Sequence, residues 1–247
     1  QKHQRHARLR TPRVRHPSPA GTDVFKPQVA HQLIVTTTAA AVFDLFGTLV
    51  ALDDPPEPAA AVADALAARG ISVPDDWASA YREPHIDAEE GAEIPLQTHV
   101  AAALASRGIN VSDTTARQAV IDAFDPVVET RGGAVEVVAA SEVGPVGLLS
   151  NCAVPELVAR TLRRSALDRE AFDAVVVSVD CGWRKPDRRA FETVASQLGV
   201  ETADLSVVGD TPATDGGITD CGGEFIDITE TSLHTLHARL TESQPCR

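Results

Sequence analysis

Four short polar stretches in this sequence carry side chains that could take part in chemistry. The first is VFDLFGTLV at 42–50, where Asp44 follows an apolar run and precedes Gly47 and Thr48. A carboxylate beside a glycine turn is suited to nucleophilic attack, because main-chain N–H groups of the turn can hold the developing oxyanion. An aspartate that only caps the turn is the alternative interpretation of this stretch taken alone.

The second stretch is GLLSN at 147–151, which ends in a hydroxyl and an amide. Ser150 and Asn151 could hold the oxygens of a group being transferred. The same pair also commonly caps a helix after a strand, so both interpretations stay open.

The third stretch is CGWRKPDRRAF at 181–191, which contains Lys185. Lys185 is the only lysine among residues 38–247, where the other fourteen cationic side chains are arginines. An ammonium is a compact point charge that a guanidinium cannot imitate, so its retention here indicates a functional requirement. Chance survival is the alternative.

The fourth stretch is VVGDTPATDGG at 207–217, which places Asp210 and Asp215 on a glycine-rich loop. Carboxylate oxygens are the ligands that Mg²⁺ prefers, and one or two of them are enough when water and phosphate complete the shell. A helix cap and a solvated loop acid are the alternative.

The elements that must position these residues are short apolar runs. AAAVF, VGLL, DAVVVS and LSVVG are predicted to be buried strands, and EFIDI at 224–228 is a fifth. Each of the first four is followed by polar residues and then a helical pattern, which predicts a doubly wound parallel sheet. The last helix, TSLHTLHARL, can be capped by Thr231 or Ser232. Because ligands bind at the carboxyl ends of such strands, Asp44, Ser150 and Asp210 should converge.

The hundred or so residues between the first two of these strands show helical periodicity and no convincing strand. Four helical patterns are visible: EPAAAVADALAARG, PDDWASAYRE, PLQTHVAAALASRG and SDTTARQAVIDAF, the last with a cap at Ser112 or Asp113. We therefore predict a helical domain at 53–125, inserted into a sheet domain formed by residues 38–52 and 126–247.

Taken in order, VFDLFGTLV, LLSN, RKP and VVGDTPATD resemble the four motifs of the haloacid dehalogenase (HAD) superfamily, and the insertion resembles its helical C1 cap. The resemblance implies a Rossmann-like α/β core and catalytic roles for Asp44, as the nucleophile, and Lys185. It also implies a Mg²⁺ ion held by Asp44, the main-chain carbonyl of Phe46 and Asp210, with Asp215 assisting directly or through water. The expected substrate-binding residues are Ser150, Asn151, Gly47 and Thr48.

Phe46 departs from the pattern of most phosphatases in this superfamily, which have a second aspartate at this position. That aspartate protonates the leaving alcohol, and general acid–base help of this kind is worth about 10²–10⁴ in rate. An aromatic residue here resembles the 2-haloacid dehalogenases, which need neither the proton nor a metal. Asp210 favours a phosphatase, because those dehalogenases look uncharged at its position and carboxylates crowded beside Asp44 would repel one another without Mg²⁺.

The sequence thus predicts a Mg²⁺-dependent hydrolase of small phosphorylated metabolites that forms an aspartyl-phosphate on Asp44. A metal-independent 2-haloacid dehalogenase and a catalytically weak HAD-like binding protein are the alternatives. For substrate recognition we expect Arg82 and also His85 to contribute. Trp77 and Tyr81, four residues apart, could equally form a pocket wall or the core of the cap.

The composition of the sequence predicts where the protein is found and what it binds. Residues 1–37 carry seven Lys or Arg against Asp23 and are expected to be a disordered basic tail or sequence upstream of the true start. Residues 38–247 carry 15 cationic and 34 acidic side chains, a net −19, which indicates a salt-adapted cytoplasmic protein that repels nucleic acid and anionic membranes. The four cysteines form no CxxC pair, and no apolar run is long enough for a membrane span. We expect a small anionic phosphate ester as the substrate and a monomer or homodimer.

Overall fold

The structure is a computed structural model that describes residues 40–52, 57–141 and 144–242. The predicted basic tail and Cys246 therefore lie outside the described residues. Within the described part of the chain, no helix combines the length and the apolar character needed to cross a membrane.

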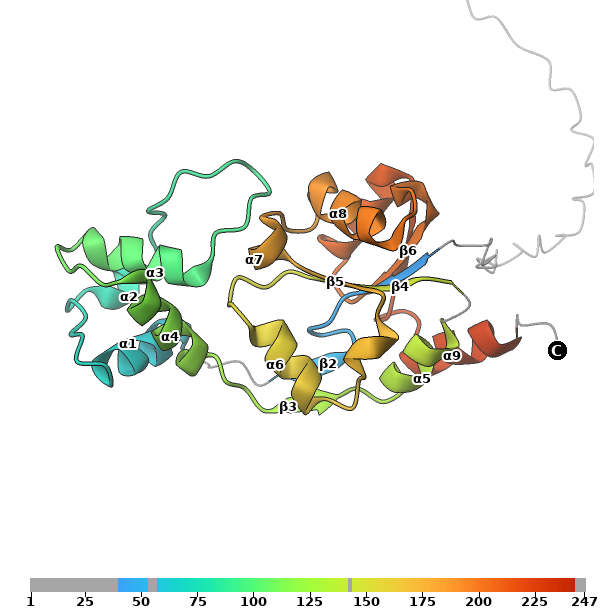
Figure 1. Ribbon diagram of the computed structural model, residues 1–247, viewed down its shortest axis with the longest axis horizontal. Coiled ribbons are helices and arrows are strands. Elements are labelled where there is room, and N and C mark those ends of the chain that lie inside the picture. The colour runs from blue at the N-terminus through green and yellow to red at the C-terminus, as the bar shows by residue number, and fades with distance from the viewer. Residues whose placement is uncertain (1–39, 53–56, 142–143, 243–247) are drawn as a thin grey trace, which may run out of the picture. The chain divides into compact units, whose positions relative to one another are not determined.

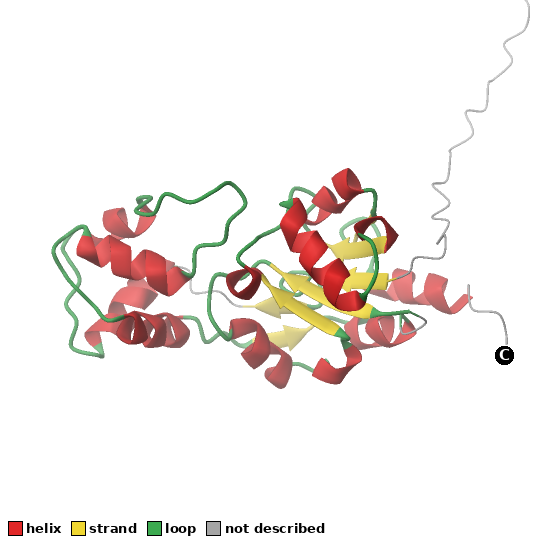
Figure 2. Cartoon of the chain, turned by 45° about the horizontal axis from the view of Figure 1, so that its top comes forward, coloured by secondary structure: helices red, strands yellow, loops and turns green. Residues whose placement is uncertain are grey.

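The core is a five-stranded sheet with the order β5-β4-β1-β6-β7, in which every neighbouring pair is parallel (Figures 1 and 2). The strands are β1 (Ala40–Phe43), β4 (Val146–Ser150), β5 (Ala174–Val177), β6 (Leu205–Gly209) and β7 (Glu224–Asp227). Val42 of β1 lies opposite Gly147 of β4 and Val207 of β6. All five strands coincide with the predicted apolar runs, and the predicted doubly wound α/β core is confirmed.

Helices cover both faces of this sheet, which explains why its strands are almost continuously apolar. The helix α8 (Arg188–Leu198) lies on one face, and α5 (Ala134–Ala140), α6 (Leu157–Arg164) and α9 (Leu233–Glu242) lie on the other (Figure 1). Val42 packs in the cluster that contains residues of α8, whereas its neighbour Phe43 packs in the cluster on the opposite face. Ser232 caps α9 as predicted, because its hydroxyl accepts a hydrogen bond from the N–H of Thr235.

The segment between β2 and β3, here called the insert, contains four helices. They are α1 (Pro58–Ala67), α2 (Trp77–Arg82), α3 (Leu96–Ala105) and α4 (Asp113–Ala123), and each falls inside one of the predicted helical patterns. Ser112 caps α4 by accepting a hydrogen bond from the N–H of Thr115. The helices pack through small and aliphatic side chains that are fully buried, including Val62, Leu66, Val100, Leu104 and Ala119.

The expectation that no strand lies between the first two strands of the sheet was wrong. β2 (Val50–Leu52) and β3 (Val128–Thr130) form an antiparallel ribbon in which Val50 faces Thr130. Each strand has three residues, too few to show a period of two, and each pairs with a segment almost eighty residues away. The ribbon pairs the chain that leads into the insert with the chain that leaves it.

The remaining short elements connect these layers. They are the helical turns η1 (Arg169–Ala171), η2 (Thr202–Asp204) and η3 (Asp215–Cys221) and the one-turn helix α7 (Ser178–Cys181). η3 begins at Asp215 and α7 follows directly on β5, so both start at the carboxyl edge of the sheet.

Candidate active site

The candidate site lies at the carboxyl end of β1, where β4 and β6 flank β1 on its two sides. This is a switch point of the sheet, the place where α/β proteins of this kind form their crevices. Asp44 follows β1 directly, and its main-chain N–H donates to the carbonyl of Val208 at 2.9 Å. The sheet itself therefore fixes the main chain of Asp44.

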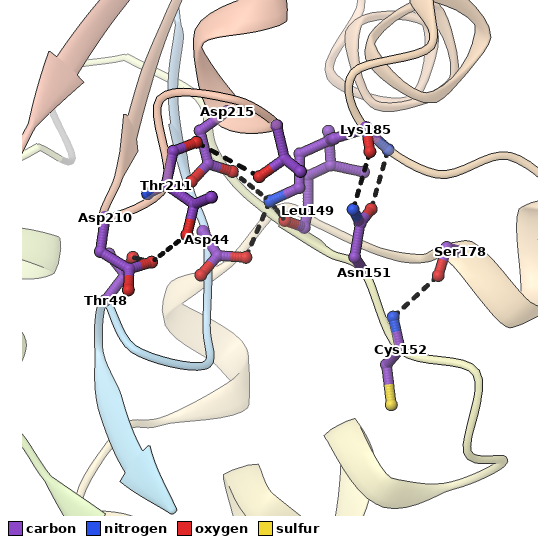
Figure 3. Close-up of polar contacts among 11 residues, drawn as sticks. Asp44, Thr48, Leu149, Asn151, Cys152, Ser178, Lys185, Asp210, Thr211 and Asp215 are labelled. Carbon is purple, nitrogen blue, oxygen red and sulfur yellow. Dashed lines mark hydrogen bonds and ion pairs between the residues drawn. The ribbon is translucent and has the colours of Figure 1, made fainter. Parts of the chain in front are cut away.

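Lys185 is the centre of the site (Figure 3). Its ammonium donates to Oδ1 of Asp44 at 2.7 Å, to Oδ1 of Asp215 at 2.6 Å and to the carbonyl oxygen of Leu149 at 2.8 Å. These three bonds use all three donors of the ammonium, and the residue is only 1% exposed. The sequence indicated Lys185 through its rarity, but no residue type could have indicated the main-chain oxygen of Leu149.

The charges in this site do not balance. One ammonium faces the carboxylates of Asp44, Asp210 and Asp215, whose ligating atoms all lie within 4.8 Å of one another. Burial raises the pKa of Asp44 above its ordinary value of 3.8, and the neighbouring carboxylates add to the rise, whereas Lys185 opposes it. A further cation would remove this cost.

The oxygens that are open to such a cation can be identified. Both oxygens of Asp215 are engaged, Oδ1 by Lys185 and Oδ2 by the N–H of Thr211 at 3.1 Å. Among the described residues, no donor reaches Oδ2 of Asp44 or Oδ2 of Asp210. The two open oxygens belong to carboxylates, which are hard ligands that Mg²⁺ prefers, and the nearby carboxylate of Asp215 adds negative charge that also favours a cation.

The turn after Asp44 supplies a further open oxygen. The N–H of Val50 donates to the carbonyl of Leu45, and the N–H of Gly47 donates to the carbonyl of Val50. This pattern leaves the main-chain carbonyl of Phe46 without a donor among the described residues, as a metal ligand would require. Because the Gly47 N–H is used inside the turn, the structure gives Gly47 a conformational role: its φ is +89°, and a Cβ there would lie 2.3 Å from Oδ2 of Asp210.

Thr48, Ser150 and Asn151 lie around this centre in three different situations. The Thr48 hydroxyl donates to Oδ1 of Asp210 at 3.2 Å, so it orients a carboxylate. The Ser150 hydroxyl is fully buried at the end of β4 and has no hydrogen-bond partner among the described residues. The Asn151 side chain exchanges two hydrogen bonds with the main chain of Lys185, at 2.8 and 2.9 Å. Ser150 therefore has its hydroxyl donor available, and Asn151 keeps one of the two N–H donors of its amide uncommitted among the described residues.

The insert residues singled out from the sequence are not joined to this centre. Arg82 is exposed at the end of α2, and no polar contact links it to the site within the described ranges. Trp77 is buried, and its indole N–H donates to the carbonyl of Ala59, which assigns it to the core of the insert. Tyr81 stacks edge-on against Trp77, and the ring of His85 contacts the carbonyl of Ala80.

The cysteine nearest to the site is not suited to nucleophilic chemistry. Cys152 is buried, and burial raises the pKa of its thiol to about 11. The thiolate is the reactive form, so the thiol is inert at neutral pH. Cys181 and Cys221 are also free thiols.

Comparisons with known proteins point to one family. Residues 38–217 match the family model described as haloacid dehalogenase-like hydrolase. The 2-haloacid dehalogenase of Pseudomonas syringae pv. Tomato DC3000 superposes with a TM-score of 0.56 at 21% identity, over 78% of this chain and 87% of that one. A predicted phosphoglycolate phosphatase from Haemophilus somnus 129pt superposes with a TM-score of 0.51 at 14% identity, over 85% of this chain and all of that one. No curated protein matches the sequence. At these identities the two structures establish the shared fold alone.

Proposed function

Because the chain belongs to the haloacid dehalogenase-like hydrolases, we propose that it is a Mg²⁺-dependent phosphatase of small phosphorylated metabolites with Asp44 as its nucleophile. One observation carries the proposal: Asp44, Asp210 and Asp215 crowd together, and Lys185, which pairs with Asp44 and Asp215, is the one buried cation at the cluster among the described residues. A metal-independent enzyme for anionic substrates would gain nothing from Asp210 and would repel its own substrate.

The chain's own residues account for the two steps of the reaction. A carboxylate oxygen of Asp44 attacks phosphorus, the bond from phosphorus to the leaving oxygen breaks, and an aspartyl-phosphate forms. Water then attacks phosphorus, the Asp44 carboxylate leaves, and inorganic phosphate is released with a proton passing to solvent. Asp44, Asp210 and the Phe46 carbonyl would hold Mg²⁺, which supplies positive charge to the phosphoryl oxygens.

Four groups of the chain can act on the phosphoryl oxygens, one through its charge and three as hydrogen-bond donors. Lys185 holds Asp44 in place and shares its charge with the transferring group. The Ser150 hydroxyl and the main-chain N–H groups of Leu45 and Phe46 have no partner among the described residues, so they are available as donors. Fixed donors aimed at developing charge stabilise a transition state without reorganisation.

Phe46 determines which esters should react well. It cannot protonate the leaving oxygen, so the departing group must stabilise its own negative charge or take its proton from water. We therefore expect aryl phosphates to be hydrolysed faster than alkyl phosphates, by up to about 10²–10⁴, the usual value of a general acid.

The test is phosphate release from a panel of aryl and alkyl phosphates at high KCl, with Mg²⁺ or with EDTA. The proposal expects release in Mg²⁺, loss of release in EDTA and a preference for good leaving groups. Release that is equal in EDTA, or no release from any ester, would reject the phosphatase.

A second candidate follows from Phe46 itself, since an aromatic residue at this position resembles the 2-haloacid dehalogenases. In that reaction Asp44 would attack carbon and a halide would leave without needing a proton. Chloride release from 2-chloropropionate in EDTA would establish this activity. If the chain releases neither phosphate nor chloride, the remaining candidate is a HAD-like binding protein.

A further inference from the structure

Residues 89–93, here called the strap, run between α2 and α3 and pair with the segment that precedes Lys185. The N–H of Arg184 donates to the carbonyl of Gly91 at 3.0 Å, and the N–H of Glu93 donates to the carbonyl of Gly182 at 2.9 Å. Ala92 and Trp183 form an antiparallel bridge between these two bonds. The insert is therefore attached, through the strap, to the main chain next to the catalytic lysine.

Arg189 fastens the other end of the strap. Its guanidinium pairs with Glu89 at 2.6 Å and with Asp187 at 2.9 Å, and it lies over the ring of Trp183, 3.3 Å from the centroid. Gly91 passes so close to Asp187 that a Cβ at Gly91 would lie 2.1 Å from a carboxylate oxygen. These contacts fix where the strap sits on the 182–189 segment.

The side chain of Glu93 makes a second and separate connection to the core. Its Oε2 accepts a hydrogen bond of 2.6 Å from the hydroxyl of Ser178, which is completely buried at the start of α7. The same hydroxyl accepts a 2.8 Å bond from the N–H of Cys152, as Figure 3 shows. The Ser178 hydroxyl thus donates one hydrogen bond and accepts another. It links the Glu93 carboxylate to the loop after β4.

These contacts form a closed ring of hydrogen bonds and main-chain segments that includes the main chain of Lys185. From Glu93 the ring runs through Ser178 to Cys152, whose neighbour Asn151 exchanges two hydrogen bonds with the Lys185 main chain. From Lys185 it returns through Arg184 and the strap to Glu93. Glu93 makes two connections of the strap to the core. Its main-chain N–H donates to the carbonyl of Gly182, and its carboxylate accepts from Ser178.

We propose that Glu93 is a positioning residue for Lys185, contributed by the insert and acting through Ser178 and Asn151. Asn151 then serves to orient Lys185 through its two hydrogen bonds with the Lys185 main chain. The inference rests on the proposed function in one respect, that Lys185 is the catalytic cation. The ammonium must reach Asp44, Asp215 and Leu149 at once, so a displaced main chain at 182–185 would lose at least one of these contacts.

The test compares three variants. Glu93→Ala removes the acceptor for Ser178, whereas Glu93→Gln keeps an oxygen there. Glu90→Ala is the matched control on the same strap, because the Glu90 side chain is exposed and, among the described residues, its one hydrogen bond is the one that its main-chain carbonyl accepts from Arg189. Steady-state kinetics with the best ester and amide hydrogen exchange over 150–153 and 182–185 are measured for each.

We expect Glu93→Ala to lower kcat about tenfold to a hundredfold with little change in KM, because a small displacement of a catalytic group costs that much. Hydrogen exchange at Cys152 and Lys185 should accelerate in the same variant. Glu93→Gln should have a kcat and exchange rates close to those of the wild type. Glu90→Ala should match the wild type in kcat and in exchange rates.

Two results would overturn the proposal. One is a Glu93→Ala variant whose exchange at 150–153 and 182–185 equals that of Glu90→Ala. The other is a Glu93→Gln variant that raises KM with kcat unchanged, which would make Glu93 a substrate contact. Since exchange is measured without substrate, it decides the positioning role even if no ester is hydrolysed.

Discussion

At the scale of single residues, Lys185 shows most directly how the site is built. Its ammonium is almost completely buried and lies between two carboxylates that would otherwise repel one another. Removing one member of such a buried set leaves the others unpaired, which costs far more than the set contributes as a whole. The position of Lys185 thus serves stability and catalysis together.

We expect Lys185→Met to lower the free energy of unfolding by about 3–5 kcal/mol in EDTA, the usual cost of breaking a buried ion pair. Mg²⁺ should recover part of this loss, because it binds the same carboxylates in the folded state only. Urea denaturation with and without Mg²⁺ measures both effects. Arg184→Met is the control, since that side chain is exposed. An equal effect of the two substitutions would contradict this account.

The sequence could indicate Lys185 because an otherwise lysine-free acidic region makes one lysine conspicuous. It could indicate Asp44, Asp210 and Ser150 because each directly follows an apolar run. It could not indicate Glu93, because a glutamate in an acidic chain is unremarkable and its partner Ser178 is 85 residues away. The engagement of Asn151 with Lys185 was equally hidden, since its partners are main-chain atoms.

At the scale of elements, the insert is joined to the core on two sides. The strap is one connection, and the end of α4 is the other. There the guanidinium of Arg160 donates to the carbonyl of Phe124 at 2.8 Å and to Asp125 at 2.9 Å, and Arg164 also pairs with Asp125 at 2.6 Å. Two arginines of α6 therefore hold the segment through which the chain returns to the sheet.

This second connection predicts a dependence on acid. The Arg164 guanidinium, with Arg160 beside it, lowers the pKa of Asp125 below its ordinary value of 3.8. A lowered pKa means that the stabilisation is present above about pH 3.8 and is lost as the pH falls through the lowered value. Asp125→Asn should therefore lower the Tm at pH 7 and make no difference in strong acid.

Thermal unfolding of wild type and Asp125→Asn across this range measures the effect. Glu129→Gln is the control, because Glu129 is exposed on β3 and takes part in no ion pair within the described ranges. A Tm difference for Asp125→Asn that is the same at pH 7 and in strong acid would argue against the ion pair.

The elements that the sequence predicted are those with a local signal. The strands of the sheet are apolar on both faces, and α4 and α9 are each preceded by a serine whose hydroxyl accepts the capping bond. The β2–β3 ribbon and the strap have no such signal, because both depend on pairing between distant segments. Their geometry is decided by tertiary contacts.

At the scale of the whole molecule, charge is the dominant property. Residues 38–247 carry a net charge of −19, and their surface carboxylates repel one another at low ionic strength. Raising the salt concentration from 0.1 M to 1 M shortens the Debye length from about 10 Å to about 3 Å. The folded state concentrates these charges more than the unfolded chain does, so it gains more from screening.

We therefore expect the Tm to rise as KCl is increased from about 0.1 M to about 1 M, because repulsion between the carboxylates then acts only over about 3 Å. NaCl at equal ionic strength should act similarly, and sucrose at equal osmolality serves as the uncharged control. A Tm that falls with KCl, or that sucrose raises by as much, would reject salt adaptation as the reason for the acidic composition.

Covalent catalysis by Asp44 is tested most directly by rapid acid quenching of the reaction with the best ester. We expect the peptide that contains Asp44 to carry one phosphoryl group when Mg²⁺ is present and none in EDTA, and Asp44→Asn to release no phosphate. Phosphate release that survives Asp44→Asn would contradict the claim, because an amide at position 44 cannot act as the nucleophile that the mechanism requires.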